Sequence, residues 1–100
     1  MSLESLTEAL RQRAAQNPKL GNKVKFVLDD ASVILWDGAG DRTSVANSDG
    51  EADTIMRLSE ENLEKLLAGT LDPTMAYMTG KLKVEGKMGV ALKINAMLSD

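Results

Sequence analysis

The sequence predicts an α+β domain with one antiparallel group of strands and helices before and after it. Residues 23–58 contain four short segments with strand-like patterns, separated by turns rich in Asp, Asn and Gly. Helical patterns occupy residues 2–16 and 59–69, and a helix, strand and helix pattern follows over residues 72–98. Alternation with a period of two indicates a strand, and apolar residues three and four apart indicate a helix. Strands grouped between helices favour the α+β class.

The first helix is expected from Ser2 to about Gln16. Ser2 is a good N-cap residue, and an apolar stripe follows at helical spacing. Asn17-Pro18 is expected to end the helix, because the residue before a proline avoids helical angles. The stripe consists of Leu3, Leu6, Leu10 and Ala14.

Four strands are expected over residues 23–28, 32–36, 42–46 and 53–58. The first alternates between apolar and lysine side chains, and the second is apolar on both faces, which is typical of a central strand. The third is more polar, as an edge strand would be. Short turns connect the four segments, so we expect three consecutive hairpins that form an antiparallel meander. The turns are Asp29-Asp30, Asp37 to Gly40 and Asn47 to Gly50.

The last four elements begin with a helix that Ser59 caps and that ends at Gly69. Asp72 and Pro73 favour the start of a short apolar helix, which Gly80 ends. A strand over residues 81–85 follows, and residues 87–98 form a closing helix that is unusually apolar. We expect this C-terminal segment to form the wall and lid of an apolar cavity.

Composition narrows the possible functions. The chain has 100 residues, which is the length of one domain, and a formal net charge of −3 at pH 7 with a pI near 4.9. An acidic chain with three aromatic residues is a poor candidate for nucleic-acid binding, which depends on phosphate neutralisation and base stacking. It contains no Cys and no His, so the sequence predicts no metal site, no cofactor and no catalysis. Neither a signal peptide nor a membrane span is recognisable, which favours a cytoplasmic protein.

Three short motifs favour structural interpretations. Gly38-Ala39-Gly40 lacks the third glycine of a dinucleotide fingerprint and lies between strands. The Asn47 to Asp53 segment resembles part of a calcium loop, but its first and last ligand positions are Val45 and Met56. The adjacent carboxylates Asp29-Asp30 and Glu60-Glu61 occur where turns and helix starts favour acids, and they do not provide the unlike environments of an acid–base pair.

Methionines and lysines are concentrated near the C-terminus. Methionine is a flexible side chain that can fill a core or adapt to varied apolar ligands, and the residue pattern alone leaves both interpretations open. The lysines are interpreted mainly as a solvated face, with transient contact to an anionic membrane surface as the second possibility. These residues are Met56, Met75, Met78, Met88 and Met97, and Lys81, Lys83, Lys87 and Lys93.

The C-terminal motifs resemble the sterol carrier protein 2 domain family, and the chain is similar to free-standing bacterial members. The most specific part of the resemblance comprises Asp72-Pro73, Ala76-Tyr77-Met78, Gly80 to Val84, Gly86 and Met88-Gly89. The segment from Asp49 to Asp53 and the helix that begins at Ser59 are also similar. This resemblance implies a five-stranded, mainly antiparallel mixed sheet with helices packed on one face. It also implies a tunnel between helices and sheet for fatty acids, fatty acyl-CoA, sterols or other lipids.

We therefore expect a single domain over residues 1–100 that binds and transfers an apolar lipid without catalysis. An interaction module with an apolar groove, or an accessory subunit that presents a lipid substrate to an enzyme, is the alternative. The expected lining of the tunnel consists of Phe26, Leu35, Met56, Leu67, Met75, Met78, Leu82, Val84, Met88 and Leu92.

Overall fold

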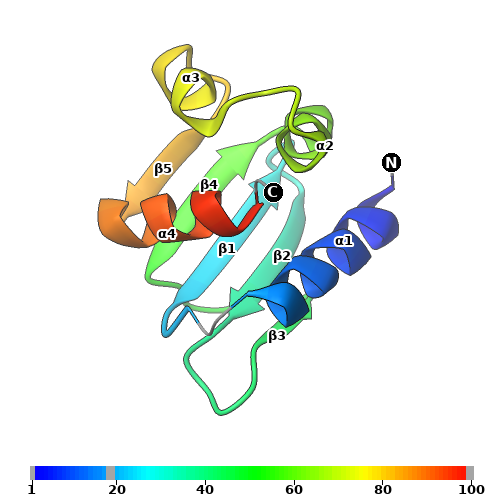
Figure 1. Cartoon of the computed structure of the whole chain (residues 1–100), viewed down its shortest axis with the longest axis vertical. Helices are drawn as coiled ribbons and strands as arrows, with labels where there is room; N and C mark the ends of the chain where they lie inside the picture. The colour runs from blue at the N-terminus through cyan, green and yellow to red at the C-terminus, as the bar shows by residue number, and fades with distance from the viewer. Residues whose placement is uncertain (1, 18–19, 99–100) are drawn as a thin grey trace.

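A computed structural model describes residues 2–17 and 20–98 as four helices and one five-stranded sheet (Figure 1). Every element expected from the sequence is present, with small differences in its bounds. Pro18, expected to end the first helix, lies outside the described residues. In chain order the elements are α1 (Leu3–Gln16), β1 (Lys23–Leu28), β2 (Ser32–Asp37), β3 (Ser44–Ala46), β4 (Thr54–Leu58), α2 (Glu60–Ala68), α3 (Pro73–Met78), β5 (Lys83–Gly86) and α4 (Met88–Leu98).

The sheet has the strand order β3-β2-β1-β4-β5, so β1 is its middle strand. The β1–β2, β2–β3 and β4–β5 pairs are antiparallel, whereas β1 and β4 are parallel. Phe26 lies beside Ile34 on β2 and Met56 on β4, and Met56 lies beside Val84 on β5. The mixed, mainly antiparallel sheet implied by the family resemblance is confirmed.

The expected meander is wrong at its fourth strand. Residues 47–53 do not form a tight hairpin but lead the chain past β2, so that β4 pairs with the far side of β1. The central strand is likewise β1 and not the 32–36 segment. Both errors have one physical reason: pairing with β1 places the apolar side chains of β4 on the same face as those of β1, and the local turn pattern carries no information about that choice.

Helix ends follow the sequence closely. Ser2 and Ser5 form a capping box at the start of α1, and the side chains of Ser59 and Asp72 accept hydrogen bonds from the backbone N–H groups of Asn62 and Met75. Gly69 and Gly80 adopt left-handed angles just after α2 and α3. These groups satisfy backbone donors and acceptors that a helix end leaves open.

The strand β5 begins later than expected because of how α3 ends. The N–H groups of Lys81 and Leu82 both donate to the carbonyl oxygen of Ala76, at 2.8 and 3.1 Å, so they complete the helix end and do not join the sheet. Leu82 is nevertheless buried, so residues 81–82 fasten α3 to the core.

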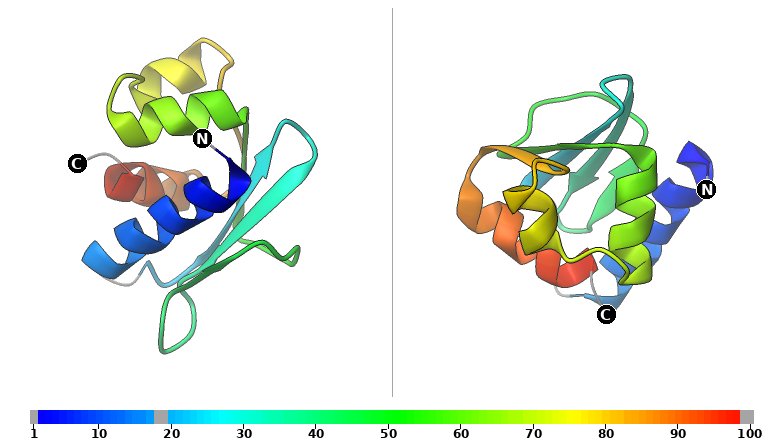
Figure 2. Two further views of the ribbon diagram at one scale, coloured as in Figure 1. Left: turned by 90° about the vertical axis from the view of Figure 1, so that its right-hand side faces the viewer. Right: turned by 90° about the horizontal axis from the view of Figure 1, so that it is seen from above.

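All four helices cover one face of the sheet (Figure 2). The core lies between the two layers and takes alternate side chains from the strands and the inner side of each helix. The other face of the sheet is open and carries charged residues, including Lys25, Arg57 and Glu85. Among the described residues, no helix is long and apolar enough to cross a membrane.

Candidate functional site

Four of the expected lining residues lie together in the core between the helices and the sheet. Phe26 and Met56 are fully buried and neighbour each other across the β1–β4 pair, and Val84 extends this row onto β5. Leu82 is also buried, and it packs in the same cluster. The core beside β4 and β5 is therefore made of apolar side chains, among them the flexible Met56.

Four other expected residues lie on the outer surface of α3 and α4. Met75, Met78, Met88 and Leu92 expose 53%, 72%, 43% and 63% of their surface. The inner side of α4 carries a different stripe, made of Val90, Ala91, Ile94 and Leu98. That stripe has the i, i+4, i+8 spacing of one helix face, which is the signal that identifies the buried side.

The remaining two residues stand apart from this group. Leu35 lies beside Lys25 and Ala46, on the open face of the sheet, because it alternates with the buried Ile34 and Trp36. Leu67 is half-buried on α2 and lines a hollow with residues 66–73. The structure therefore does not bring the ten residues into one wall.

Trp36 has a feature that the sequence pattern did not reveal. Its side chain is buried in the core, and its indole Nε1–H has no hydrogen-bond partner in the part of the chain that the structure describes. An unpaired buried donor costs about 1–3 kcal/mol, so it is uncommon without a function or a bound acceptor. The single buried Trp on a strand is the only sequence signal that could have drawn attention to it.

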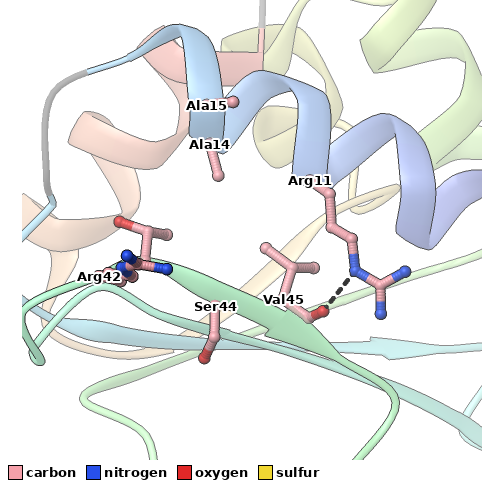
Figure 3. A pocket seen from close by; sticks show the side chains of 7 residues that line it. Arg11, Ala14, Ala15, Arg42, Ser44 and Val45 are labelled. Atoms are coloured by element: carbon pink, nitrogen blue, oxygen red, sulfur yellow. Dashed lines mark hydrogen bonds between the residues drawn. The ribbon is translucent and has the colours of Figure 1, made fainter.

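A hollow of about 510 Å³ lies between α1 and β3 (Figure 3). Arg11 and Arg42 are at opposite ends of it, with Ala14 and Val45 between them, and Arg11 Nε donates to the carbonyl oxygen of Val45 at 2.8 Å. That bond fixes α1 to the edge strand. None of the expected lining residues contributes to this hollow.

Among the described residues, no group of three or more Asp, Glu, His or Cys side chains is placed to hold a metal ion. The charged groups that do cluster tie strands together. Arg57 Nε donates to Glu85 Oε2 across β4 and β5, and Asp30 lies 3.7 Å from the same guanidinium. The bond to Glu85 raises the pKa of Arg57.

Asp53 joins three segments at one end of the sheet. Its carboxylate accepts a hydrogen bond from the backbone N–H of Lys23 at 2.9 Å and another from the Asn22 amide, and it lies 3.9 Å from Lys87 Nζ. The pKa of Asp53 is lowered, mainly by the Lys23 N–H bond and then by the Asn22 amide. Asp49 has a lowered pKa through its bond to the Lys25 ammonium at 2.9 Å.

Solved structures share this arrangement of helices on one face of a mixed sheet. Sterol carrier protein 2 from Yarrowia lipolytica, in its apo form, aligns over 95% of this chain and 84% of its own with a TM-score of 0.74 and 24% identity. The UbiJ-SCP2 ubiquinone synthesis protein aligns over 95% of this chain and 90% of its own, with a TM-score of 0.73 and 18% identity. These similarities confirm the fold.

The curated relatives that this chain matches are much longer proteins. Hydroxysteroid dehydrogenase-like protein 2 from Xenopus laevis is 46% identical over 78 residues, and the Danio rerio protein is 37% identical over 79 residues. The matched region covers 74% and 77% of this chain but 19% of each relative. The chain thus spans about a fifth of the length of these relatives.

A family model described as the SCP-2 sterol transfer family matches residues 3–99, which is nearly the whole chain. Family and fold together support lipid binding or transfer as the general activity. The chain belongs to the SCP-2 sterol transfer family.

Proposed function

We propose that this chain binds one apolar lipid between its helices and its sheet and transfers it within the cytoplasm, without catalysing a reaction. The ligand classes we propose are fatty acids, fatty acyl-CoA, and sterol-like or isoprenoid lipids. One observation supports this most directly. All five large apolar side chains that are exposed in the described part of the chain belong to α3 and α4, which cover the apolar interior beside β4 and β5.

Binding would be driven by removal of the ligand from water. Each buried methylene group contributes about 0.8 kcal/mol, so a long acyl chain needs only modest further contacts. For the ligand to enter, α3 or α4 has to move away from the sheet and turn Met75, Met78, Met88 or Leu92 towards it. Methionine suits such a change, because its side chain repacks easily.

The Trp36 indole offers a hydrogen-bond donor to the polar group of such a ligand. Fatty acids, acyl-CoA thioesters and hydroxylated lipids all carry an acceptor oxygen, whereas a pure hydrocarbon does not. Pairing the buried N–H with a ligand oxygen would remove the cost of leaving it unsatisfied. The proposal therefore favours lipids with an acceptor at one end.

The decisive experiment measures ligand binding to delipidated protein. A fluorescent fatty acid should quench Trp36 saturably, and unlabelled fatty acid or acyl-CoA should compete and raise the thermal midpoint. At a hundredfold excess over Kd the stability gain is about 2.7 kcal/mol. Quenching that never saturates, together with an unchanged midpoint across all four ligand classes, would contradict the proposal.

A pair of matched variants tests whether the lipid binds on the helix-covered face of the sheet. Val84→Phe adds bulk on the helix-covered face of β5, where Val84 packs half-buried against the core. Val33→Phe adds the same bulk on the open face of β2, beside Val27. We expect at least tenfold weaker binding for Val84→Phe and less than a twofold change for Val33→Phe, with both variants folded by circular dichroism.

A second candidate function is that of an accessory domain that presents a lipid to an enzyme. It is favoured by the two relatives named hydroxysteroid dehydrogenase-like protein 2, of which the matched region forms 19%. An alkylsulfatase from Pseudomonas also contains a matching region, with a TM-score of 0.61 over 14% of its length. Transfer of a fluorescent lipid between vesicles by the chain alone would favour the carrier, whereas tight binding without transfer would favour presentation.

A further inference from the structure

In the part of the chain that the structure describes, the exposed large apolar side chains and a group of lysines lie at the same end of the molecule. We define the α3–α4 surface as Met75, Tyr77, Met78, Met88 and Leu92, which expose between 43% and 72% of their area. Both helices flank β5, the edge strand that connects them (Figure 1, Figure 2). Exposed apolar groups concentrated in this way, with none elsewhere among the described large side chains, mark an interaction site.

The charge of this end is opposite to that of the rest of the chain. Residues 73–98 carry four lysines and one glutamate, whereas the whole chain has twelve basic and fifteen acidic residues. The glutamate, Glu85, is paired with Arg57. Lys81 and Lys93 are exposed and form no ion pair with any residue that the structure describes, and Lys87 is 68% exposed.

From this combination we infer that the α3–α4 surface docks on an anionic lipid bilayer, with the apolar side chains entering the interface and Lys81, Lys87 and Lys93 contacting the headgroups. Each basic side chain near an anionic membrane strengthens binding by about fivefold. Tyr77 fits the interface because its ring is apolar and its hydroxyl is polar. Lys83 lies beside Arg57 on the open face and is left out of this contact.

A second copy of the chain is a poorer occupant than a membrane. A symmetric dimer through this surface would place the lysines of both copies against each other, and like charges across an interface are unfavourable. A bilayer supplies both things that the surface lacks, which are an apolar layer and a plane of negative charge. This inference rests on the proposed function, because lipid carriage gives the chain a reason to contact a membrane. Docking itself is measured independently of lipid carriage.

The experiment is flotation with vesicles of phosphatidylcholine containing 30% phosphatidylglycerol, compared with phosphatidylcholine alone, at low and high salt. We expect binding to the anionic vesicles at low salt, at least tenfold weaker binding to the neutral ones, and release at high salt. Two double variants, Met75→Ser/Met78→Ser and Lys81→Gln/Lys93→Gln, should each bind the anionic vesicles at least tenfold more weakly than the parental protein. Arg42→Gln/Lys65→Gln removes two exposed charges elsewhere and should change binding less than twofold.

Insertion is measured directly with Tyr77→Trp in a Trp36→Phe background, which places the single Trp in α3. Its emission should shift to the blue on anionic vesicles and be quenched by brominated acyl chains. Binding of a fluorescent fatty acid in vesicle-free solution is measured for the parental protein and for every variant that keeps Trp36. Retained fatty-acid binding with no flotation of the parental protein would overturn docking and leave lipid carriage standing.

Three further results would overturn the docking inference. Equal binding to neutral and anionic vesicles would remove the role of the lysines, and unchanged flotation of Met75→Ser/Met78→Ser would remove the role of α3. A parental dimer that Met75→Ser/Met78→Ser converts to a monomer would assign the surface to self-association. If the parental protein floats with anionic vesicles but does not bind the fatty acid, the proposed function is contradicted and docking is not.

Discussion

The helices α1 and α4 pack on the same face of the sheet and contact each other, yet their outer sides differ. The outer side of α1 carries charged and polar residues, among them Glu4, Glu8 and Arg11, and its start is closed by a capping box. The outer side of α4 exposes Met88 and Leu92 and lacks an acid in its first turn and a base in its last. Thus α1 is complementary to water on one side and to the core on the other, whereas the outer side of α4 exposes large apolar side chains beside Lys93.

Their attachments differ in the same way. Arg11 bonds to the Val45 carbonyl and Asn47 bonds to Thr7, so α1 is joined to the β3 region by side-chain hydrogen bonds near its middle. The start of α4 is held where Thr54 Oγ1 donates to the Lys87 carbonyl at 2.8 Å, and near its end the Asn17 amide donates to the Met97 carbonyl at 3.5 Å. Between these points Val90, Ala91 and Ile94 pack in the core. We therefore expect α1 to be a permanent part of the scaffold and α4 to be the helix that opens.

The largest effect is expected where β5 turns into α4. Gly86 has a φ of +96°, and a Cβ there would overlap the carbonyl oxygen of Asp53. Gly86→Ala should therefore lower the free energy of unfolding by about 3 kcal/mol or more, through strain and lost β4–β5 pairing. The control is Gly89→Ala, where the added Cβ meets nothing within 4 Å and the helix should gain up to about 1 kcal/mol. Equal stability of the two variants in urea titrations would show that the chain does not require glycine at position 86.

Substitutions of buried residues compare the two helices directly. Leu10 on α1 and Ile94 on α4 are both fully buried, so Leu10→Ala and Ile94→Ala should each cost about 2–5 kcal/mol. Amide hydrogen exchange should separate them, because Ile94→Ala is expected to accelerate exchange within α4 alone and Leu10→Ala to accelerate it across the sheet. Uniform acceleration by Ile94→Ala would show that α4 is as integral to the fold as α1.

Acid should weaken the ties that Asp53 and Asp49 make. Both have lowered pKa values in the folded protein, so their contribution is fully present above the ordinary value of 3.8 and is lost as the pH falls through the lower, folded value. We expect the thermal midpoint to fall progressively below about pH 4. Asp53→Asn should have a lower thermal midpoint than the parent at pH 7, and the two midpoints should converge in acid. If the difference between the two midpoints does not change with pH, the ionised Asp53 carboxylate is not the source of this stability.

The smallest effect is expected in the β1–β2 hairpin, at the opposite end of β1 from the Asp53 tie. Asp29 and Asp30 are the central residues of a turn closed by the Ala31 N–H and the Leu28 carbonyl, and their φ values of +53° and +55° are left-handed angles that favour Asn and Gly. Asp30→Gly should raise the free energy of unfolding by about 0.5–1 kcal/mol by removing this strain. The gain is reduced by loss of the exposed contact with Arg57, and a destabilised variant would show that this contact outweighs the strain.

Local features of the fold could be predicted because they depend on residues close in sequence. Ser2, Ser59 and Asp72 fix where helices begin, Gly69 and Gly80 fix where they end, and alternation in the 23–28 segment identifies β1 and its buried face. The C-terminal motifs also identified the family, and through it the mixed sheet that the meander interpretation missed.

Tertiary structure alone decided the remaining features, because each depends on residues distant in sequence. The parallel pairing of β4 with β1 follows from burying Met56 beside Phe26, thirty positions away. The rotation of α4 was ambiguous because nearly every position is apolar, and packing on the sheet selected Ile94 for the core and left Leu92 outside. The unpaired indole of Trp36 is likewise visible only once its neighbours are in place, because the sequence records a donor but not whether an acceptor lies beside it.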